Sequence, residues 1–250
     1  MRTQCPGIWA YGPSISLVAA ILLMLAIPAH AVGESHLTPH KAEYKVKVYI
    51  LSGKLITKVN ATDDGYSVRS ELHAAGLARL FVRGVVIESS TFSANEDGIR
   101  PMIYSSVDKI SKEDVYMDFA FDWDAKLATG TINEEEISVP LDGRVHDRVS
   151  IQYELMLDLI NDRTSEEYTL LDDNKLKRLN VSNIGTKTVK VPFGEFTAVG
   201  IQHRKDKSDR ITTLWCVEEL DYLPVLIEQH RDGKRALRAE LATYVPTASE

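Results

Sequence analysis

Histidine side chains are the first groups in this chain that could do chemistry, because two of them are spaced for a metal ion. His36 and His40 are four residues apart, a spacing that suits a metal when the segment is helical. Pro39 lies between them, which argues against a helix there. The remaining histidines after this pair are scattered, without a Cys or carboxylate companion at ligand spacing: His73, His146, His203 and His230. The pattern therefore assigns no metal ligand.

Cysteine could supply a nucleophile, but its context here argues against that role. Cys216 lies in the apolar run Thr213-Leu214-Trp215-Cys216-Val217, which is typical of a strand. Because a reactive thiol needs a nearby base or a helix N-terminus to lower its pKa, we expect Cys216 to be buried and unreactive. The sequence also lacks a Gly-x-Ser-x-Gly elbow, a phosphate-binding glycine loop and a dinucleotide-binding fingerprint.

Carboxylates are numerous, yet most lie in predicted turns. Glu134 to Glu136 and the pair Asp172-Asp173 are expected to be solvated there. Asp122 stands between Phe121 and Trp123, and strand alternation turns this carboxylate outward and both rings inward. The sequence assigns no catalytic residue and no cofactor, and the ligand-binding residues stay unknown.

The first 31 residues have the pattern of a secretory signal peptide. Arg2 is followed by an apolar run over residues 17–27, then by Pro28 and the small residues of Ala29-His30-Ala31. The run is too short for a membrane anchor, which needs about 20 apolar residues. We expect cleavage after about Ala31, a mature protein without a transmembrane anchor, and the periplasm as its location.

Loss of this leader would also remove Cys5, so Cys216 would be alone and no intramolecular disulfide could form. The formal net charge of the whole chain is −7, spread over both signs. This composition predicts no nucleic-acid partner, and it argues against electrostatic docking on anionic lipid, which uses clustered Lys and Arg. The charged run from His203 to Arg210 fits a solvated hairpin loop better than a phosphate site, because its signs are mixed.

Alternation of apolar and polar residues with period two predicts strands through most of the chain after the leader. The predicted strands cover residues 43–50, 55–61, 66–72, 85–93, 103–109, 115–123, 127–132, 137–141, 168–171, 177–184, 186–191, 196–203, 211–217, 225–229 and 236–244. Asp232-Gly233 between the last two is a strong hairpin signal. Short strands at such intervals indicate an antiparallel sandwich or barrel-like sheet.

One segment has helical spacing instead. Residues 147–160 are predicted to form a helix with Asp147 as its N-cap. Its main apolar face consists of Val149, Tyr153, Met156, Leu157 and Ile160, and this face is widened by Ile151, Leu155 and Leu159. So wide a face suggests a helix packed onto the sheet. A weaker helix is predicted over residues 74–81, where Leu77, Leu80 and Phe81 could pack together.

These patterns predict a mainly β protein with minor α content: a curved antiparallel sheet, as a half-barrel or sandwich, with one packed amphipathic helix. Residues 32–250 are expected to form a single β-rich domain. Asp142-Gly143-Arg144 is the best internal boundary, and it could separate two sheet-forming halves over residues 40–141 and 145–245.

Several short segments, in their order, resemble the bacterial family catalogued as domain of unknown function 3108. The segments are Phe121-Asp122-Trp123, Asp147 leading to Ser150, Val191-Pro192-Phe193-Gly194-Glu195-Phe196, Trp215, and Tyr222-Leu223-Pro224-Val225. The resemblance runs from about His40 to Tyr244 and implies an exported, β-rich protein. The family has no established activity, so it supplies no catalytic residues. The chain is also loosely similar in pattern to half-barrel envelope proteins that carry lipoproteins around an apolar cavity.

Three functions remain open at this stage. The first is a non-enzymatic periplasmic binding or assembly module that takes a lipid or lipoprotein in an apolar concavity. Aromatic residues could line such a cavity, although core packing is the simpler role for each: Tyr44, Phe92, Phe121, Trp123 and Trp215. The second is a hydrolase of envelope polymers, built from His73, His203 or His230 beside an acid in a pocket. The third is a structural partner of an envelope complex, which would present a large exposed apolar patch.

Overall fold

The computed structural model of the protein describes residues 37–80, 82, 84–95, 97–163, 165–206 and 208–247. The predicted leader lies outside the described residues, and so do His36 and Phe81. The strands before the helix are β1 (His40–Val48), β2 (Leu51–Thr62), β3 (Gly65–Ala74), β4 (Val85–Asn95), β5 (Gly98–Asp108), β6 (Val115–Asp122), β7 (Leu127–Ile132), β8 (Glu135–Pro140) and β9 (Val145–His146). Those after it are β10 (Glu167–Asp172), β11 (Lys175–Val191), β12 (Gly194–Lys205), β13 (Arg210–Val217), β14 (Leu223–Arg231) and β15 (Lys234–Pro246).

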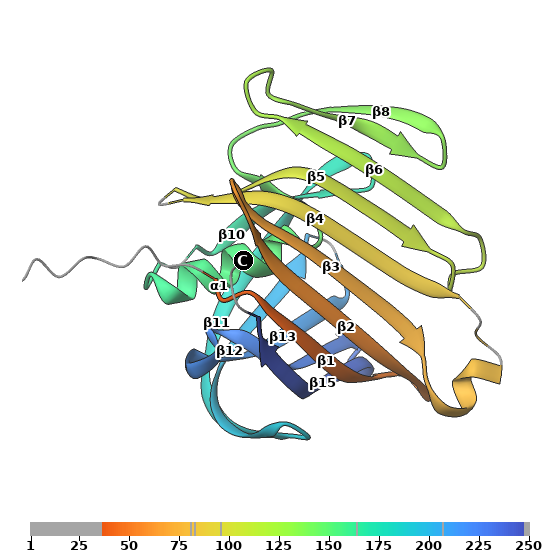
Figure 1. The fold of residues 1–250 in the computed structure, drawn as a ribbon, viewed down its shortest axis with the longest axis vertical. Helices are drawn as coiled ribbons and strands as arrows, with labels where there is room; N and C mark the ends of the chain where they lie inside the picture. The colour runs from red at the N-terminus through yellow and green to blue at the C-terminus, as the bar shows by residue number, and fades with distance from the viewer. Residues whose placement is uncertain are drawn as a thin grey trace, which may run out of the picture. The chain divides into compact units, whose positions relative to one another are not determined.

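All of these strands belong to one curved sheet (Figure 1). Its order is β8-β7-β6-β5-β4-β3-β2-β1-β15-β14-β13-β12-β11-β10-β9, and every neighbouring pair is antiparallel except β9 and β10. Strands that follow one another in the chain are therefore neighbours, except β8 and β9, which lie at the two ends of this order. The one neighbouring pair that is not consecutive is β1 with β15, which forms the central seam. The predicted mainly β class, with a curved antiparallel sheet and one packed helix, is confirmed.

The predicted helix is present as α1 (Ser150–Ile160). Its N-cap position is taken by Val149 and not by Asp147 as predicted, but the Asp147 side chain accepts from the amides of the turn that leads into the helix. One carboxylate oxygen of Asp147 accepts the backbone N–H groups of Val149 and Ser150, and the other accepts the Ser90 hydroxyl at 2.7 Å. Asp147 is fully buried, so these donors satisfy a carboxylate that water does not reach. Asp147 also connects this turn to β4 through Ser90.

Helix α1 is apolar on two faces, and each face packs into a different cluster. One cluster joins it to β1–β7 and the central strands, with Tyr153, Met156 and Leu157 buried in it. The other joins Ile151 and Leu155 to inward-facing residues of β10–β13. Figure 1 shows α1 between these two parts of the sheet. The wide apolar face read from the sequence therefore serves two contacts at once.

Two short 3-10 helices complete the described part, η1 (Gly76–Leu80) and η2 (Glu218–Leu220). The helix predicted over residues 74–81 is thus a single 3-10 segment, and the predicted packing of its leucines is wrong, because Leu77 and Leu80 are exposed. A second difference is that residues 177–184 and 186–191 form the single strand β11, with a pairing irregularity between Asn183 and Thr186. No helix in the described ranges combines the length and apolarity needed to cross a membrane.

Candidate functional site

The hollow with the most coherent lining lies beside α1, between its second apolar face and β10–β14. Its volume is about 460 Å³, within the range of small-molecule pockets. Its apolar wall consists of Ile151, Leu155, Leu170, Leu179 and Leu214. Four cationic side chains also line this hollow: Arg148, Lys205, Arg210 and Arg231. We call this feature the basic hollow.

Two other hollows are less suited to a ligand. A hollow of about 560 Å³ lies farther along α1 and shares Leu155 with the basic hollow, but its wall mixes both charges, with Asp158, Arg163 and Glu166. A hollow of about 650 Å³ lies at the β2–β3 turn, where exposed Asp63 and Asp64 form part of its rim. Neither joins an aliphatic wall to charges of predominantly one sign, so the basic hollow is the candidate site.

Buried Asp172 holds the inner cations of the basic hollow in place. Its carboxylate contacts Arg148 Nε at 2.7 Å, Lys177 Nζ at 2.6 Å and Lys205 Nζ at 2.5 Å. Burial acts to raise the pKa of Asp172, but the hydrogen bonds from Lys177 and Lys205 and the charge of Arg148 outweigh it and hold this pKa below its usual range. Asp172 is therefore ionised at neutral pH.

The outer cations are less fully neutralised. Arg231 contacts Asp209 at 3.4 Å, while Arg210 has no acidic partner among the described residues. Asp173 adds a second carboxylate to Arg148, at 2.8 Å. The five cations of the hollow and its rim, including Lys177, thus face three carboxylates. An anionic group of a ligand would meet an excess of positive charge there.

His203 also lines the basic hollow and is neutral at pH 7. Burial, followed by the charge of Lys205, lowers the pKa of His203 to about 4. The charged run from His203 to Arg210, which the sequence placed in a solvated loop, supplies several residues of the rim on both sides of the β12–β13 turn. Arg231 of β14 lines the hollow together with this run, although the two are not close in the sequence.

Replacing Asp172 with asparagine is expected to lower the stability of the fold at pH 7 and to flatten its response to acid. The pKa of Asp172 lies below the ordinary value of 3.8 in the folded state. Its ionised form therefore stabilises the fold above that pH, and the contribution is lost as the pH falls below about 4. Urea unfolding at a series of pH values measures both effects.

The matched control is Asp173→Asn, because Asp173 contacts the same Arg148 and Lys177 but its side chain is about half exposed. This variant should change the pH dependence much less. Equal slopes in the wild type and both variants below pH 4 would contradict the role given to Asp172.

The other candidate residues from the sequence lie apart from the basic hollow. His40 is buried and its Nδ1 contacts the carbonyl of Thr38, while His73 contacts Glu71 at 3.1 Å in a half-buried pair. His146 is buried in the core, where burial lowers its pKa to about 3. Within the described ranges no group of three or more His, Cys, Asp or Glu residues is placed to hold a metal.

Cys216 is buried as predicted, and burial raises the pKa of its thiol to about 12. Asp122 points outward as predicted and accepts the backbone N–H of Ala125, while Phe121 and Trp123 stack at 6.2 Å on the inner side. The five aromatic residues considered as cavity lining belong to the main core instead: Tyr44, Phe92, Phe121, Trp123 and Trp215.

The aliphatic residues that line the basic hollow were not recognised from the sequence as a binding wall. Ile151 and Leu155 appeared only as a widening of the helix face, and Leu170, Leu179 and Leu214 only as inward positions of strands. The width of the helix face was the one available signal, because one sheet contact does not need so many apolar positions. The pairing that brings three separate strands to this helix has no local signature.

Comparison with known proteins gives one family match and similarity to solved structures. The family model described as Protein of unknown function (DUF3108) matches residues 42–239. A solved structure of a beta-barrel-like protein with the domain of unknown function DUF1849, from Brucella abortus, is similar at a TM-score of 0.56 and 14% identity, over 85% of this chain and 99% of that one. A protein from Bacteroides fragilis described as having a YmcC-like fold matches at a TM-score of 0.37 and 12% identity, over 84% and 97%. No curated protein matches the chain.

Proposed function

The chain belongs to the DUF3108 family of proteins of unknown function, and from this premise we propose that it is a non-enzymatic binding protein whose basic hollow takes the acyl chain of an anionic lipid. The observation that carries the proposal is that one hollow has both an aliphatic wall and an excess of cationic side chains at its rim. The wall would shield the acyl chain from water, and the cations would hold the anionic group. The proposal includes the periplasm as the compartment, on the basis of the predicted leader.

Two features support an acyl chain rather than a polar ligand. The five wall residues are aliphatic and come from four elements, α1, β10, β11 and β13. Each is at most 9% exposed because they pack against one another, so a ligand would contact the apolar surface that this cluster turns toward the hollow. The polar groups lie on one rim, where Arg148 and Lys205 are fixed by Asp172 and Arg210 stands without an acidic partner among the described residues. A molecule with one apolar and one anionic end matches this division.

Titration with cis-parinarate, a fluorescent fatty acid, tests the proposal. The wild type should enhance the fluorescence of the probe at saturable sites, with one site per chain. Gln152→Trp, which adds an indole at the rim of the hollow on the first turn of α1, should weaken binding about tenfold or more, because the side chain occupies the space of the ligand. Leu214→Trp should do the same from the wall, and its unfolding curve checks the fold.

The charge of the rim is tested by Arg210→Gln, which should weaken binding of cis-parinarate by roughly tenfold through loss of one charge-assisted contact. Arg100→Gln is the matched control, since Arg100 is also an exposed arginine but lies outside the hollow. A wild type without saturable binding, or Gln152→Trp and Leu214→Trp with wild-type affinity, would refute the proposal.

A further inference from the structure

The turns at one end of the sheet lie together because of its antiparallel order. The β1–β2 turn, the η1 segment between β3 and β4, the β12–β13 turn and the β14–β15 turn all connect strands at this end. The register confirms that two of these turns are neighbours, because Val48 pairs with Leu237 and the Tyr49 N–H donates to the Ala236 carbonyl. Segment η1 is fastened to the same place, since the Ala75 N–H donates to the Ser52 carbonyl at 2.8 Å.

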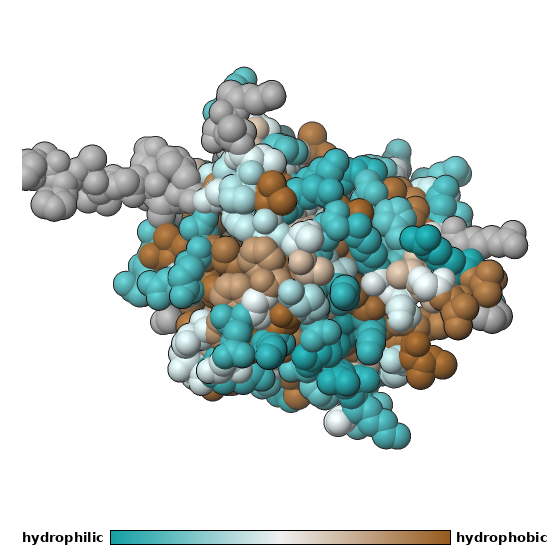
Figure 2. Space-filling view, turned by 60° about the horizontal axis from the view of Figure 1, so that its bottom comes forward, coloured by the Kyte–Doolittle hydropathy of each residue, from teal (hydrophilic) through white to brown (hydrophobic). Residues whose placement is uncertain are grey.

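Large apolar side chains are exposed at this end. Ile50 is 94% exposed, Leu77 78% and Leu80 69%, and Tyr49 of the β1–β2 turn and Leu51 at the start of β2 are also exposed. These five make up half of the large apolar side chains that are exposed in the described part of the chain, and they come from two adjoining segments. Figure 2 shows apolar side chains gathered at the right-hand edge of the view, at this end. We call these five residues the apolar end.

The charges next to the apolar end are mostly positive. Residues 47–54, 74–80 and 232–236 contain five cations, Lys47, Lys54, Arg79, Lys234 and Arg235, and one carboxylate, Asp232. The β5–β6 turn at the same end adds both signs, with Lys109 and Lys112 against Glu113 and Asp114, and Asp209 lies beside Arg210 in the β12–β13 turn. Of the first five cations, Lys54 and Arg235 contact Glu43 and Glu228, whereas the other three have no acidic partner among the described residues. The acidic composition of the whole chain therefore conceals a locally cationic end.

From this combination we propose that the apolar end docks on the surface of an anionic lipid bilayer. The turns would insert Ile50, Leu77 and Leu80 into the interface between headgroups and acyl chains, and the flanking Lys and Arg would meet the anionic headgroups. Isolated exposed apolar residues are ordinary in proteins. Five of them in adjoining segments, bordered by cations, match the two-part chemistry of a membrane surface.

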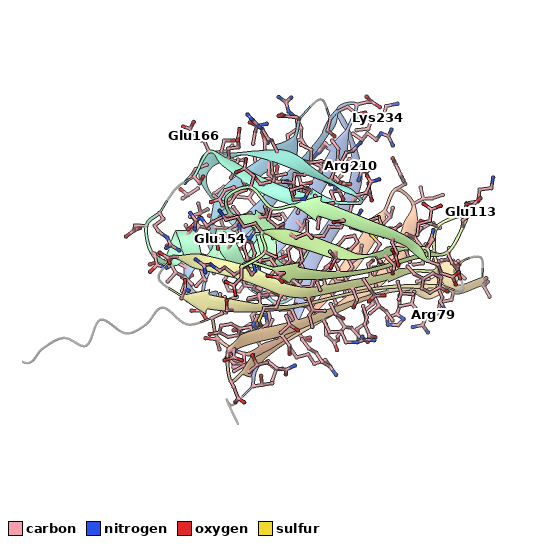
Figure 3. The ribbon with its side chains drawn as sticks, turned by 90° about the horizontal axis from the view of Figure 1, so that it is seen from above. Arg79, Glu113, Glu154, Glu166, Arg210 and Lys234 are labelled. Atoms are coloured by element: carbon pink, nitrogen blue, oxygen red, sulfur yellow. The ribbon has the colours of Figure 1, made fainter. Side chains whose placement is uncertain are left out.

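The position of the basic hollow agrees with this docking. Its rim residues Arg210 and Arg231 are paired across β13 and β14, and Arg231 pairs in turn with Lys234. In Figure 3, Arg79, Arg210, Lys234 and Glu113 lie toward one end of the sheet, and Glu154 and Glu166 lie toward the other. Docking would therefore bring the rim close to the bilayer, from which an acyl chain could enter. This last step rests on the proposed function, whereas the docking itself does not.

Flotation of the purified protein with vesicles tests the inference. We expect binding to vesicles of phosphatidylcholine with phosphatidylglycerol, and weaker binding to phosphatidylcholine alone. The double variant Ile50→Asp with Leu77→Asp should lose about tenfold or more of its vesicle affinity. Lys47→Gln with Lys234→Gln should lose several-fold of the preference for phosphatidylglycerol. Ile103→Asp with Val245→Asp is the matched control, because both residues are exposed apolar side chains outside the apolar end.

The outcomes separate the two proposals. If the Ile50 and Leu77 double variant floats like the wild type while cis-parinarate still binds, the docking is refuted and the proposed function stands. If the wild type floats but does not bind cis-parinarate, the hollow is refuted and the docking stands. A wild type that does not float, and that sedimentation shows to be a dimer dissociated by Ile50→Asp, would mean that a second copy covers the apolar end, and the inference would be wrong.

Discussion

Replacing Phe92 with alanine should lower the free energy of unfolding by about 3–5 kcal/mol. Phe92 is completely buried in β4, and its ring lies 6.0 Å from that of Tyr66 on β3 and 5.5 Å from that of Tyr153 on α1. The substitution leaves a cavity between the sheet and the helix, because neither backbone can move inward without breaking strand pairs. Urea unfolding followed by tryptophan fluorescence measures the loss.

The matched control for Phe92 is Phe193→Ala. Phe193 is also aromatic and also stacks on a neighbour, Phe196 at 6.0 Å, but it is 38% exposed in the β11–β12 turn. Phe193→Ala should lower the free energy of unfolding by less than half as much as Phe92→Ala, since much of the Phe193 surface stays in water when the protein folds. Equal losses for the two variants would mean that Phe92 does not connect α1 to the sheet as described.

Replacing Asp147 with alanine should lower the free energy of unfolding by about 2–4 kcal/mol. The buried carboxylate accepts three hydrogen bonds, from the Val149 and Ser150 amides and the Ser90 hydroxyl. Alanine leaves all three donors without a partner in a place that water does not reach, and it removes the acceptor at the turn that leads into the helix, which forms one wall of the basic hollow. Affinity for cis-parinarate should fall together with stability.

Two further variants separate these hydrogen bonds from general burial. Asp147→Asn keeps an acceptor oxygen for the helix amides and should recover part of the loss. Asp122→Ala also removes a side-chain acceptor, that of the Ala125 amide, but in an exposed turn, so it should change stability by well under half as much. A variant Asp147→Ala as stable as the wild type would show that these hydrogen bonds contribute little.

Much of the fold could be predicted because its signals are local. Alternation marked most strands, and the Asp232-Gly233 turn lies between β14 and β15 as expected. The spacing from Val149 to Ile160 and the acceptor at Asp147 located the helix, although it begins at Ser150. Each of these features depends on residues within a few positions of one another, so the sequence displays them directly.

The candidate site was harder to predict because it depends on pairing between distant segments. Leu170, Leu179 and Leu214 look like any inward strand residues until β10, β11 and β13 are placed beside α1. Leu77 and Leu80 show the opposite error. Their apolar character predicted packing, but η1 lies beyond the end of the sheet, where the described structure provides no element to cover them.

The central seam between β1 and β15 has a consequence for the order of folding. His40 pairs with Pro246 and Val48 with Leu237, so the strands that hold the two parts of the sheet together are nearly the whole chain apart. Strands of one hairpin can pair as soon as both are available, whereas β1 can pair with β15 only when the last strand is present. This pairing also closes the longest loop in the chain and therefore has the largest entropy cost of loop closure. Until then β1 and β14 each have an unpaired edge that other chains could join.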